Sequence, residues 1–183
     1  MLYIIPIFVI MPIILMGIML IVPSIIGKRI PPSFTKEKTQ ILNIAKNELF
    51  QLLTDYKNYP TWVKYLFQVK TERIGNGKIK IMQTYKKRKN YQELTEVRRI
   101  ENEKISEISI FKSEDEGVTL WTYILKNFSD NKTKMTIRET MYIYHPYLRF
   151  MLKYILRDEN GKGDFFNNIK RFIRKNKNKK DKK

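Results

Sequence analysis

The chain has 183 residues, of which 43% are hydrophobic, which suits one globular domain with appended segments. The absence of cysteine excludes disulfides and thiolate nucleophiles, and the single histidine, His145, excludes multi-histidine metal centres. We expect no metal and no cofactor. The formal net charge is +18, and residues 1–27 carry no charged side chain. The excess charge on the remainder favours an anionic partner, either nucleic acid or a membrane surface.

The N-terminal segment is an uncharged apolar run over residues 2–26. As a helix it would extend about 37 Å, enough to cross a hydrocarbon core of about 30 Å. Its prolines and Gly17 are tolerated in membrane helices. A cleaved signal peptide would need a basic leader and a small-residue cleavage site, which the sequence lacks, and a buried soluble helix is the third reading. We therefore predict a transmembrane anchor and a short proline linker over residues 1–32.

The charges that flank this run predict its orientation. Lys28, Arg29, Lys36 and Lys38 follow it, and nothing charged precedes it. By the positive-inside rule, the N-terminus lies outside and the domain lies on the cytoplasmic side of the membrane.

The body of the chain changes from helical to strand periodicity after a first strand at 33–42. A helix is predicted over 43–55, with its N-cap at Asn43 or a residue or two later, and an irregular stretch at 55–66 contains Trp62. Alternation of apolar and polar residues then predicts six strands joined by short turns, with Asn76-Gly77 as a hairpin turn. The six strands span residues 67–74, 78–87, 91–100, 104–113, 118–127 and 132–144.

The C-terminal part returns to helical spacing after His145-Pro146. Apolar residues recur over 147–158 and again over 164–176, which predicts one long helix that is kinked or broken near Gly161. Residues 176–183 are predicted to be a basic disordered tail. The expected fold class is α+β: a curved antiparallel sheet of about seven strands wrapped around the long helix, plus the transmembrane helix.

Two segments resemble the START-like or Bet v 1-like helix-grip superfamily, specifically its polyketide cyclase/dehydrase and lipid-transport group (SRPBCC). They are "AKNELFQLLTDYKNYPTWVKYLFQV" at 45–69 and "NKTKMTIRETMYIYHPYLRFML" at 131–152. The resemblance covers residues 33–175, and Lys132 departs from it where the group often has glycine. It implies a cavity between sheet and helix that holds a lipid, quinone, hormone or polyketide, and it implies no universal catalytic residue.

Polar and aromatic residues on the predicted inward strand faces are candidate ligand contacts. Glu139 shares a face with Met141, and Gln83 shares one with Tyr85; such groups either orient a ligand in an apolar cavity or reach water near strand ends, which is the favoured reading. Trp62 either plugs one end of the core or touches a ligand, and its N–H needs a partner. The full candidate set is Trp62, Tyr65, Gln83, Tyr85, Trp121, Tyr123, Glu139 and Met141.

Catalysis has weak support from the sequence. Glu139 and His145 are the only candidates for an acid–base pair, and an extended strand would separate them by about 20 Å. A binding role is therefore favoured over an enzymatic one.

Basic residues are candidates for contact with an anionic leaflet, with a solvated tail as the alternative. Nucleic-acid binding is less favoured because no RNP, KH or helix-turn-helix pattern is present. The candidate membrane-surface residues are Lys28, Arg29, Lys86, Lys87, Arg88, Lys89, Lys170, Arg171, Arg174 and Lys175.

The sequence thus favours a membrane-anchored module that binds or transfers a lipid, an isoprenoid or quinone, or another hydrophobic small molecule. The alternatives are a cyclase- or hydrolase-type enzyme on an apolar substrate, and a ligand-free protein-interaction module at the membrane.

Overall fold

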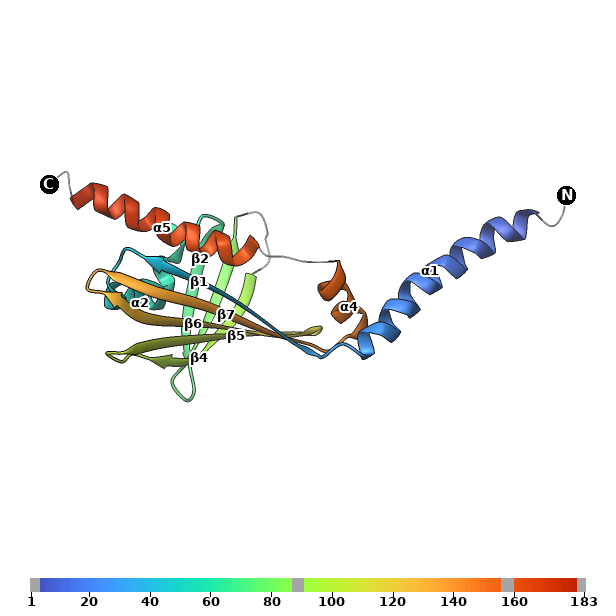
Figure 1. Cartoon of the computed structure of the whole chain (residues 1–183), viewed down its shortest axis with the longest axis horizontal. Coiled ribbons are helices and arrows are strands. Elements are labelled where there is room, and N and C mark those ends of the chain that lie inside the picture. The colour runs from blue at the N-terminus through green and yellow to red at the C-terminus, as the bar shows by residue number, and fades with distance from the viewer. Residues whose placement is uncertain (1–3, 87–90, 156–159, 181–183) are drawn as a thin grey trace. The chain divides into compact units, whose positions relative to one another are not determined.

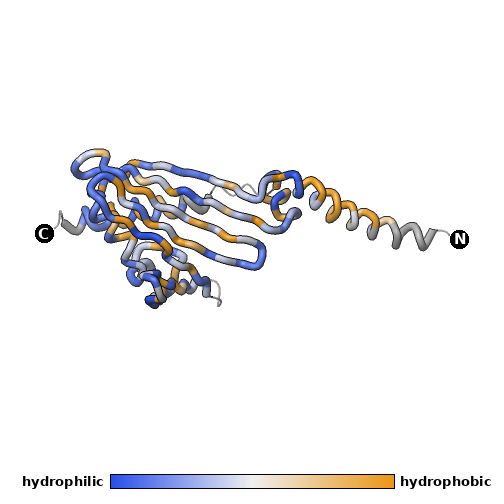
Figure 2. Tube along the Cα trace, turned by 90° about the horizontal axis from the view of Figure 1, so that it is seen from below, coloured by the Kyte–Doolittle hydropathy of each residue, from blue (hydrophilic) through white to orange (hydrophobic). Residues whose placement is uncertain are grey.

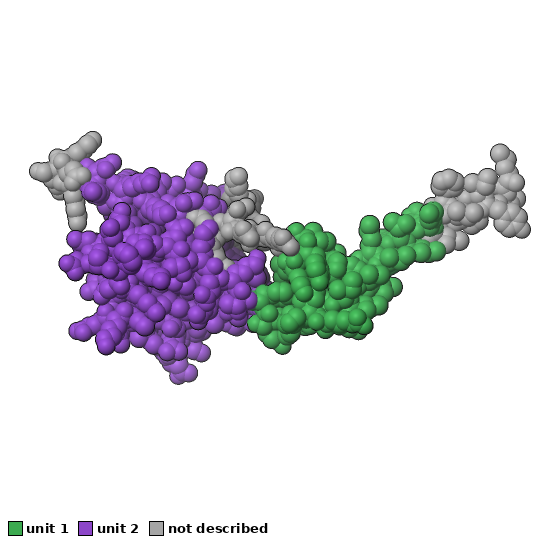
Figure 3. All heavy atoms as spheres, viewed as in Figure 1, with its two compact units in different colours: residues 1–34, 115–117, 142–158 green, residues 35–114, 118–141, 159–183 purple. Residues whose placement is uncertain are grey.

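A computed structural model of the chain describes residues 4–86, 91–155 and 160–180; the side chains of 4–10, 13, 160–163, 179 and 180 are outside this description. The chain forms two compact units, coloured separately in Figure 3. Unit 1 comprises residues 1–34, 115–117 and 142–158, and unit 2 comprises residues 35–114, 118–141 and 159–183.

Unit 1 contains two helices, α1 (Ile4–Lys28) and α4 (Pro146–Tyr154). The described turns of α1 are hydrophobic, as the orange tube in Figure 2 shows, and large apolar side chains such as Met16 and Met19 are exposed. The described part of the chain holds no helix of sufficient length and apolarity to cross a membrane.

The end of α1 packs against the start of α4. Gly27 is buried so close to Pro146 that a Cβ atom at residue 27 would lie 1.8 Å from the Pro146 carbonyl oxygen. Nearby, the backbone N–H of Ile143 donates to the carbonyl of Pro32 at 2.8 Å. Only glycine therefore fits at residue 27. Proline begins α4 as the sequence predicted, because the first residue of a helix needs no N–H.

Unit 2 is built on one seven-stranded antiparallel sheet in the order β1-β7-β6-β5-β4-β3-β2. In Figure 1 the strand β2 runs steeply across the view while β7 runs nearly horizontally, so the sheet is strongly curved. Every predicted strand is present, with bounds within two residues of expectation. The strands are β1 (Ser33–Leu42), β2 (Leu66–Ile74), β3 (Lys78–Tyr85), β4 (Tyr91–Ile100), β5 (Ile105–Glu114), β6 (Gly117–Ser129) and β7 (Lys132–Ile143).

The β2–β3 hairpin confirms the predicted turn. Asn76 and Gly77 have φ angles of 64° and 71°, the left-handed values that Asn-Gly turns favour. Ile74 pairs with Lys78, and this register places Val69 opposite Gln83.

Three short helices separate β1 from β2: α2 (Lys46–Thr54), the single-turn η1 (Tyr56–Asn58) and α3 (Tyr59–Trp62). The first of them starts two residues later than a cap at Asn43 would give, within the predicted range, because Ala45 occupies the cap position and makes no side-chain cap bond. The Thr133 hydroxyl donates to the Ile44 carbonyl at 2.7 Å. This bond holds the chain in a bend after β1 and delays the helix start.

The C-terminal region forms two helices where one interrupted helix was predicted. α4 ends at Tyr154, earlier than expected, and α5 spans Asn160–Lys180, so Gly161 lies inside α5. The apolar side chains of α4 from Pro146 to Leu152 are half-buried in unit 1, where α4 contacts α1.

The predicted disordered tail also needs correction, since residues 176–180 continue α5 and only 181–183 lie outside the described residues. Lysines propagate a helix well and are favoured at its C-terminal end, where the helix dipole is negative.

The core of unit 2 lies between the sheet, α2 and α5 (Figure 1). Phe166 and Ile169 of α5 are completely buried, as are Leu49 and Leu53 of α2. Ile81, Ile108, Leu125 and Met135 supply the sheet side of this core. The expectation that a C-terminal helix covers the inner sheet face is thus confirmed for α5.

Candidate functional site

The inward face of the sheet becomes less covered along β6 and β7. On β7, Met135 and Ile137 are buried, whereas Glu139 and Met141 are half-buried. On β6, Leu125 is buried, whereas Tyr123 and Trp121 are half-buried. The core therefore gives way to a partly open stretch that carries aromatic, polar and thioether side chains.

Trp121 and Glu139 meet across this stretch. The indole Nε1–H of Trp121 donates to Glu139 Oε1 at 2.9 Å. Burial raises the pKa of the neighbouring Tyr123 above its ordinary value, with smaller contributions from Tyr65 and Glu139. The structure thus brings together two residues that the sequence analysis had proposed independently, and their bond fixes the carboxylate.

A second polar group links β3, β4 and the segment before β2. Gln83 is buried and faces Gln92 across the strands. The Tyr85 hydroxyl donates to Gln92 Oε1 and lies 3.4 Å from Gln83 Oε1. Tyr65 stacks on Tyr85 with ring centroids 5.9 Å apart, and partial burial raises the pKa of Tyr65 to about 12. Three predicted ligand residues therefore lie together.

Trp62 belongs to an aromatic cluster between α3 and α5. Its ring lies 4.7 Å from Tyr59, 5.6 Å from Phe165 and 6.4 Å from Phe172, measured between centroids. Tyr123 of β6 stacks on Phe165 at 5.5 Å. Trp62 thus packs at the helical side of the core.

Arg171 of α5 joins Trp62 to a residue that sequence reasoning missed. Its Nη2 donates to the main-chain carbonyl of Trp62 at 3.2 Å and to Asn168 Oδ1 at 2.7 Å. Arg171 therefore has a structural contact in addition to its predicted place on a basic surface. Asn168 gave no sequence signal, because nothing in the adjacent pair Asn167-Asn168 marks one of the two asparagines as buried.

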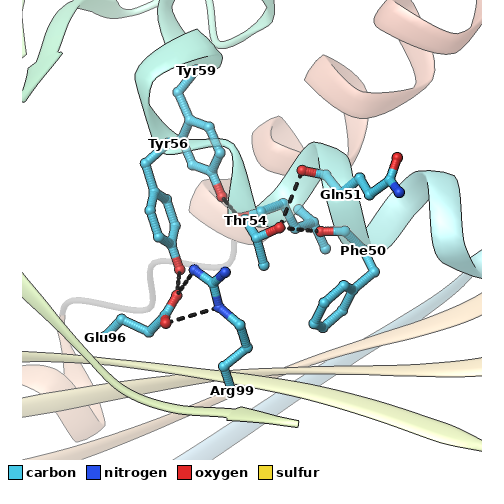
Figure 4. Close-up of polar contacts among 8 residues, drawn as sticks. Phe50, Gln51, Thr54, Tyr56, Tyr59, Glu96 and Arg99 are labelled. Atoms are coloured by element: carbon cyan, nitrogen blue, oxygen red, sulfur yellow. Dashed lines mark hydrogen bonds and ion pairs between the residues drawn. The ribbon is translucent and has the colours of Figure 1, made fainter. Parts of the chain in front are cut away.

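A buried ion pair lies beneath α2 and η1 (Figure 4). Arg99 donates to Glu96 from Nε at 2.9 Å and from Nη2 at 2.8 Å, and the Tyr56 hydroxyl donates to Glu96 Oε2. The side chain of Glu96 is only 4% exposed. Burial raises the pKa of Tyr56 far above its ordinary value, and the hydrogen bond to Glu96 and the charge of Glu96 raise it further. Because both carboxylate oxygens are engaged, this group is best explained as a structural ion pair.

A β-bulge explains why this pair escaped prediction. Glu96 pairs with Ile110 and Arg98 pairs with Ser109, so Val97 is an extra residue on β4. Residues three apart on a regular strand face opposite sides, whereas the bulge turns Arg99 to the face of Glu96.

The remaining predicted residues lie elsewhere. His145 is exposed in unit 1 and its side chain makes no cap bond to α4, and Lys28 and Arg29 are exposed at the end of α1. Lys86 is exposed, whereas Lys87, Arg88 and Lys89 lie outside the described residues. On α5, Arg174 and Lys175 are exposed and Lys170 is half-buried.

Comparison with sequence families and with curated proteins gives no match for this chain. Solved structures do match. A START superfamily protein from Mycobacterium smegmatis has a TM-score of 0.55 at 10% identity, over 77% of this chain and 97% of that one. The Zhui aromatase/cyclase from a Streptomyces species has a TM-score of 0.56 at 11% identity, over 75% and 91%.

A norcoclaurine synthase variant from Thalictrum flavum, solved with a transition-state analogue, has a TM-score of 0.58 at 10% identity, over 79% of this chain and 96% of that one. At these identities the likeness establishes the fold, which is the helix-grip fold that the sequence predicted.

Proposed function

We propose that the protein binds or transfers a hydrophobic small molecule, such as a lipid, an isoprenoid or a quinone, on the inner face of the unit 2 sheet. One observation carries the proposal. The inward faces of β6 and β7 pass from fully buried to half-buried where Trp121, Tyr123, Glu139 and Met141 lie. Half-covered aromatic surface with a fixed polar group is the lining that an apolar ligand with one polar end requires.

The structural neighbours support a small-molecule role and offer a second candidate, a cyclase-type enzyme. One of them is an aromatase/cyclase, and norcoclaurine synthase has been solved with dopamine and hydroxybenzaldehyde. The two described acids on the inward face, Glu96 and Glu139, both accept hydrogen bonds from protein donors. Because neither acid is presented as an unengaged base, binding is favoured over catalysis.

Filling the half-covered stretch is expected to block the ligand. Met141→Trp adds bulk to the inward face, so the amount of hydrophobic small molecule that co-purifies with the full chain should fall at least tenfold. Solvent extraction followed by mass spectrometry measures it. Lys134→Trp is the matched control, because Lys134 is exposed on the same strand. Equal retention by both variants, or a wild-type extract that holds only the solubilising lipid, would refute the binding proposal.

We further propose that α1 anchors the protein in a membrane, with its N-terminus outside and unit 2 on the cytoplasmic side. Support comes from the uncharged sequence of residues 1–27 and from the exposed apolar side chains of α1. The exposed Lys28 and Arg29 and the basic residues of α5 suit an anionic leaflet.

Aspartates within α1 are expected to release the protein from membranes. Each charge near the middle of a span costs about 2.5–3.5 kcal/mol, so Ile18→Asp combined with Leu20→Asp should move the chain into the supernatant after carbonate extraction. Ile41→Asp is the control, since Ile41 is an equally exposed apolar residue on β1. Release of the wild-type chain by carbonate would contradict the anchor.

A further inference from the structure

Two hydrogen-bond donors are buried without acceptors between α3 and α5. The side chains of Trp62 and Asn168 are 3% and 4% exposed. Within the described residues, Trp62 Nε1 and Asn168 Nδ2 have no hydrogen-bond partner. Native proteins pair nearly all such groups, because an unpaired buried donor loses its bond to water and gains nothing in return.

The two donors belong to one locality. Arg171 Nη2 contacts the Trp62 carbonyl and Asn168 Oδ1, so both residues lie within hydrogen-bond distance of the same nitrogen. A third buried atom in the described residues lacks a partner, Gln40 Oε1 on β1; it is an acceptor, and neither donor reaches it. The α3–α5 locality therefore offers N–H groups in excess of acceptors, beside a cationic guanidinium.

The surroundings of the Trp62 donor are aromatic. Tyr59, Phe165 and Phe172 surround the Trp62 ring, and Tyr123 extends the cluster to the half-covered face of β6. The Tyr59 hydroxyl donates to the Leu53 carbonyl at 2.6 Å, and it accepts from neither buried donor, since within the described residues both donors lack any hydrogen-bond partner. A complementary molecule would be apolar and flat, with an oxygen atom that accepts hydrogen bonds.

We propose that Trp62 Nε1 and Asn168 Nδ2 bind a carbonyl-type oxygen of the hydrophobic ligand, and that this donor pair selects oxygenated molecules over hydrocarbons. The inference rests on the proposed function and specifies its ligand class. A water molecule could accept from the same donors, and the experiment separates the two.

The test compares two probes that differ in one group, acetylnaphthalene and ethylnaphthalene, with the full chain in lipid nanodiscs. The chain has two tryptophans, so a proton–nitrogen correlation spectrum resolves two indole N–H signals. Acetylnaphthalene should shift the Trp62 signal downfield and bind about tenfold more tightly than ethylnaphthalene, the gain expected when buried donors acquire an acceptor.

Three variants control the measurement. Trp62→Phe removes one donor, and Asn168→Asp removes the other while it keeps an acceptor for Arg171; each should abolish most of the tenfold preference. Asn167→Asp is the matched control and should retain the preference, because Asn167 is exposed on the same helix. The signal missing from the spectrum of the Trp62→Phe variant also assigns the two indole resonances.

The remaining outcomes overturn the inference in distinguishable ways. If both probes bind equally and the Trp62 signal does not move, apolar binding stands and the donor pair has no ligand role. The donor pair binds water rather than ligand if the Trp62 N–H shows an unchanged cross-peak to water when acetylnaphthalene is bound. If neither probe binds, the proposed function itself fails.

Discussion

Replacing Arg99 with methionine is expected to destabilise unit 2 by about 3 kcal/mol. The change removes the partner of a carboxylate that is 4% exposed, and a buried charge without a partner is costly. This expected loss of stability is at the low end for buried ion pairs, because the Arg99 side chain is itself 36% exposed and water screens part of the interaction. Urea unfolding followed by tryptophan fluorescence measures the effect, since both tryptophans lie in unit 2.

The same strand supplies the control. Arg98 is 59% exposed, and its Nε lies 3.6 Å from Glu107, so Arg98→Met should cost less than about 0.5 kcal/mol. Adding Glu96→Gln to the Arg99 variant should recover much of the loss, because a neutral amide can still accept from Tyr56. If Arg98→Met and Arg99→Met prove equally mild, the Glu96 carboxylate is not the buried charge described here.

Replacing Gly27 with alanine is expected to separate α1 from α4. The new methyl group would lie 1.8 Å from the Pro146 carbonyl oxygen and 2.5 Å from its carbon, and a backbone group cannot yield as a flexible side chain can. Alanine is the better helix former by about 1 kcal/mol, so loss of packing here would oppose intrinsic propensity. The backbone amides of Arg149 in α4 and of Ile155, the residue that caps the end of α4, should exchange with deuterium at least tenfold faster.

Gly17 in the same helix provides the comparison. A Cβ atom there would meet nothing within 4 Å, so Gly17→Ala should leave α4 exchange unchanged. Faster exchange in both variants would mean that the effect travels through α1 itself. Unchanged exchange in both would mean that α4 does not depend on this contact.

Periodicity in the sequence was enough to locate the strands of unit 2. Alternation of apolar and polar residues placed every strand, because each strand has one face in the core and the side-chain period of two follows directly. The Asn76-Gly77 turn could also be predicted from the sequence, since few residue pairs adopt its positive φ angles. Pro146 marked a helix start for a comparably local reason.

Candidate site residues were predictable only where counting alternate residues along a strand assigns each residue to the correct face of the sheet. Counting placed Gln83 and Tyr85 on one face of β3 and Glu139 with Met141 on one face of β7, and the structure then showed that Trp121 reaches Glu139. Counting failed at Val97, where one extra residue turns Arg99 to the side of Glu96. A bulge depends on pairing with the neighbouring strand, which a single strand's sequence does not display.

By itself, therefore, the sequence determined the strands, the tight turn, the helix-grip layout and the uncharged character of residues 1–27, because each is set by local chemistry and spacing. Tertiary structure alone decided that α4 belongs with α1, that Glu96 is neutralised by Arg99, and that within the described residues the buried N–H groups of the Trp62 and Asn168 side chains have no acceptor. These last features depend on contacts between residues far apart in the chain, or on the absence of such contacts, and no local pattern encodes either.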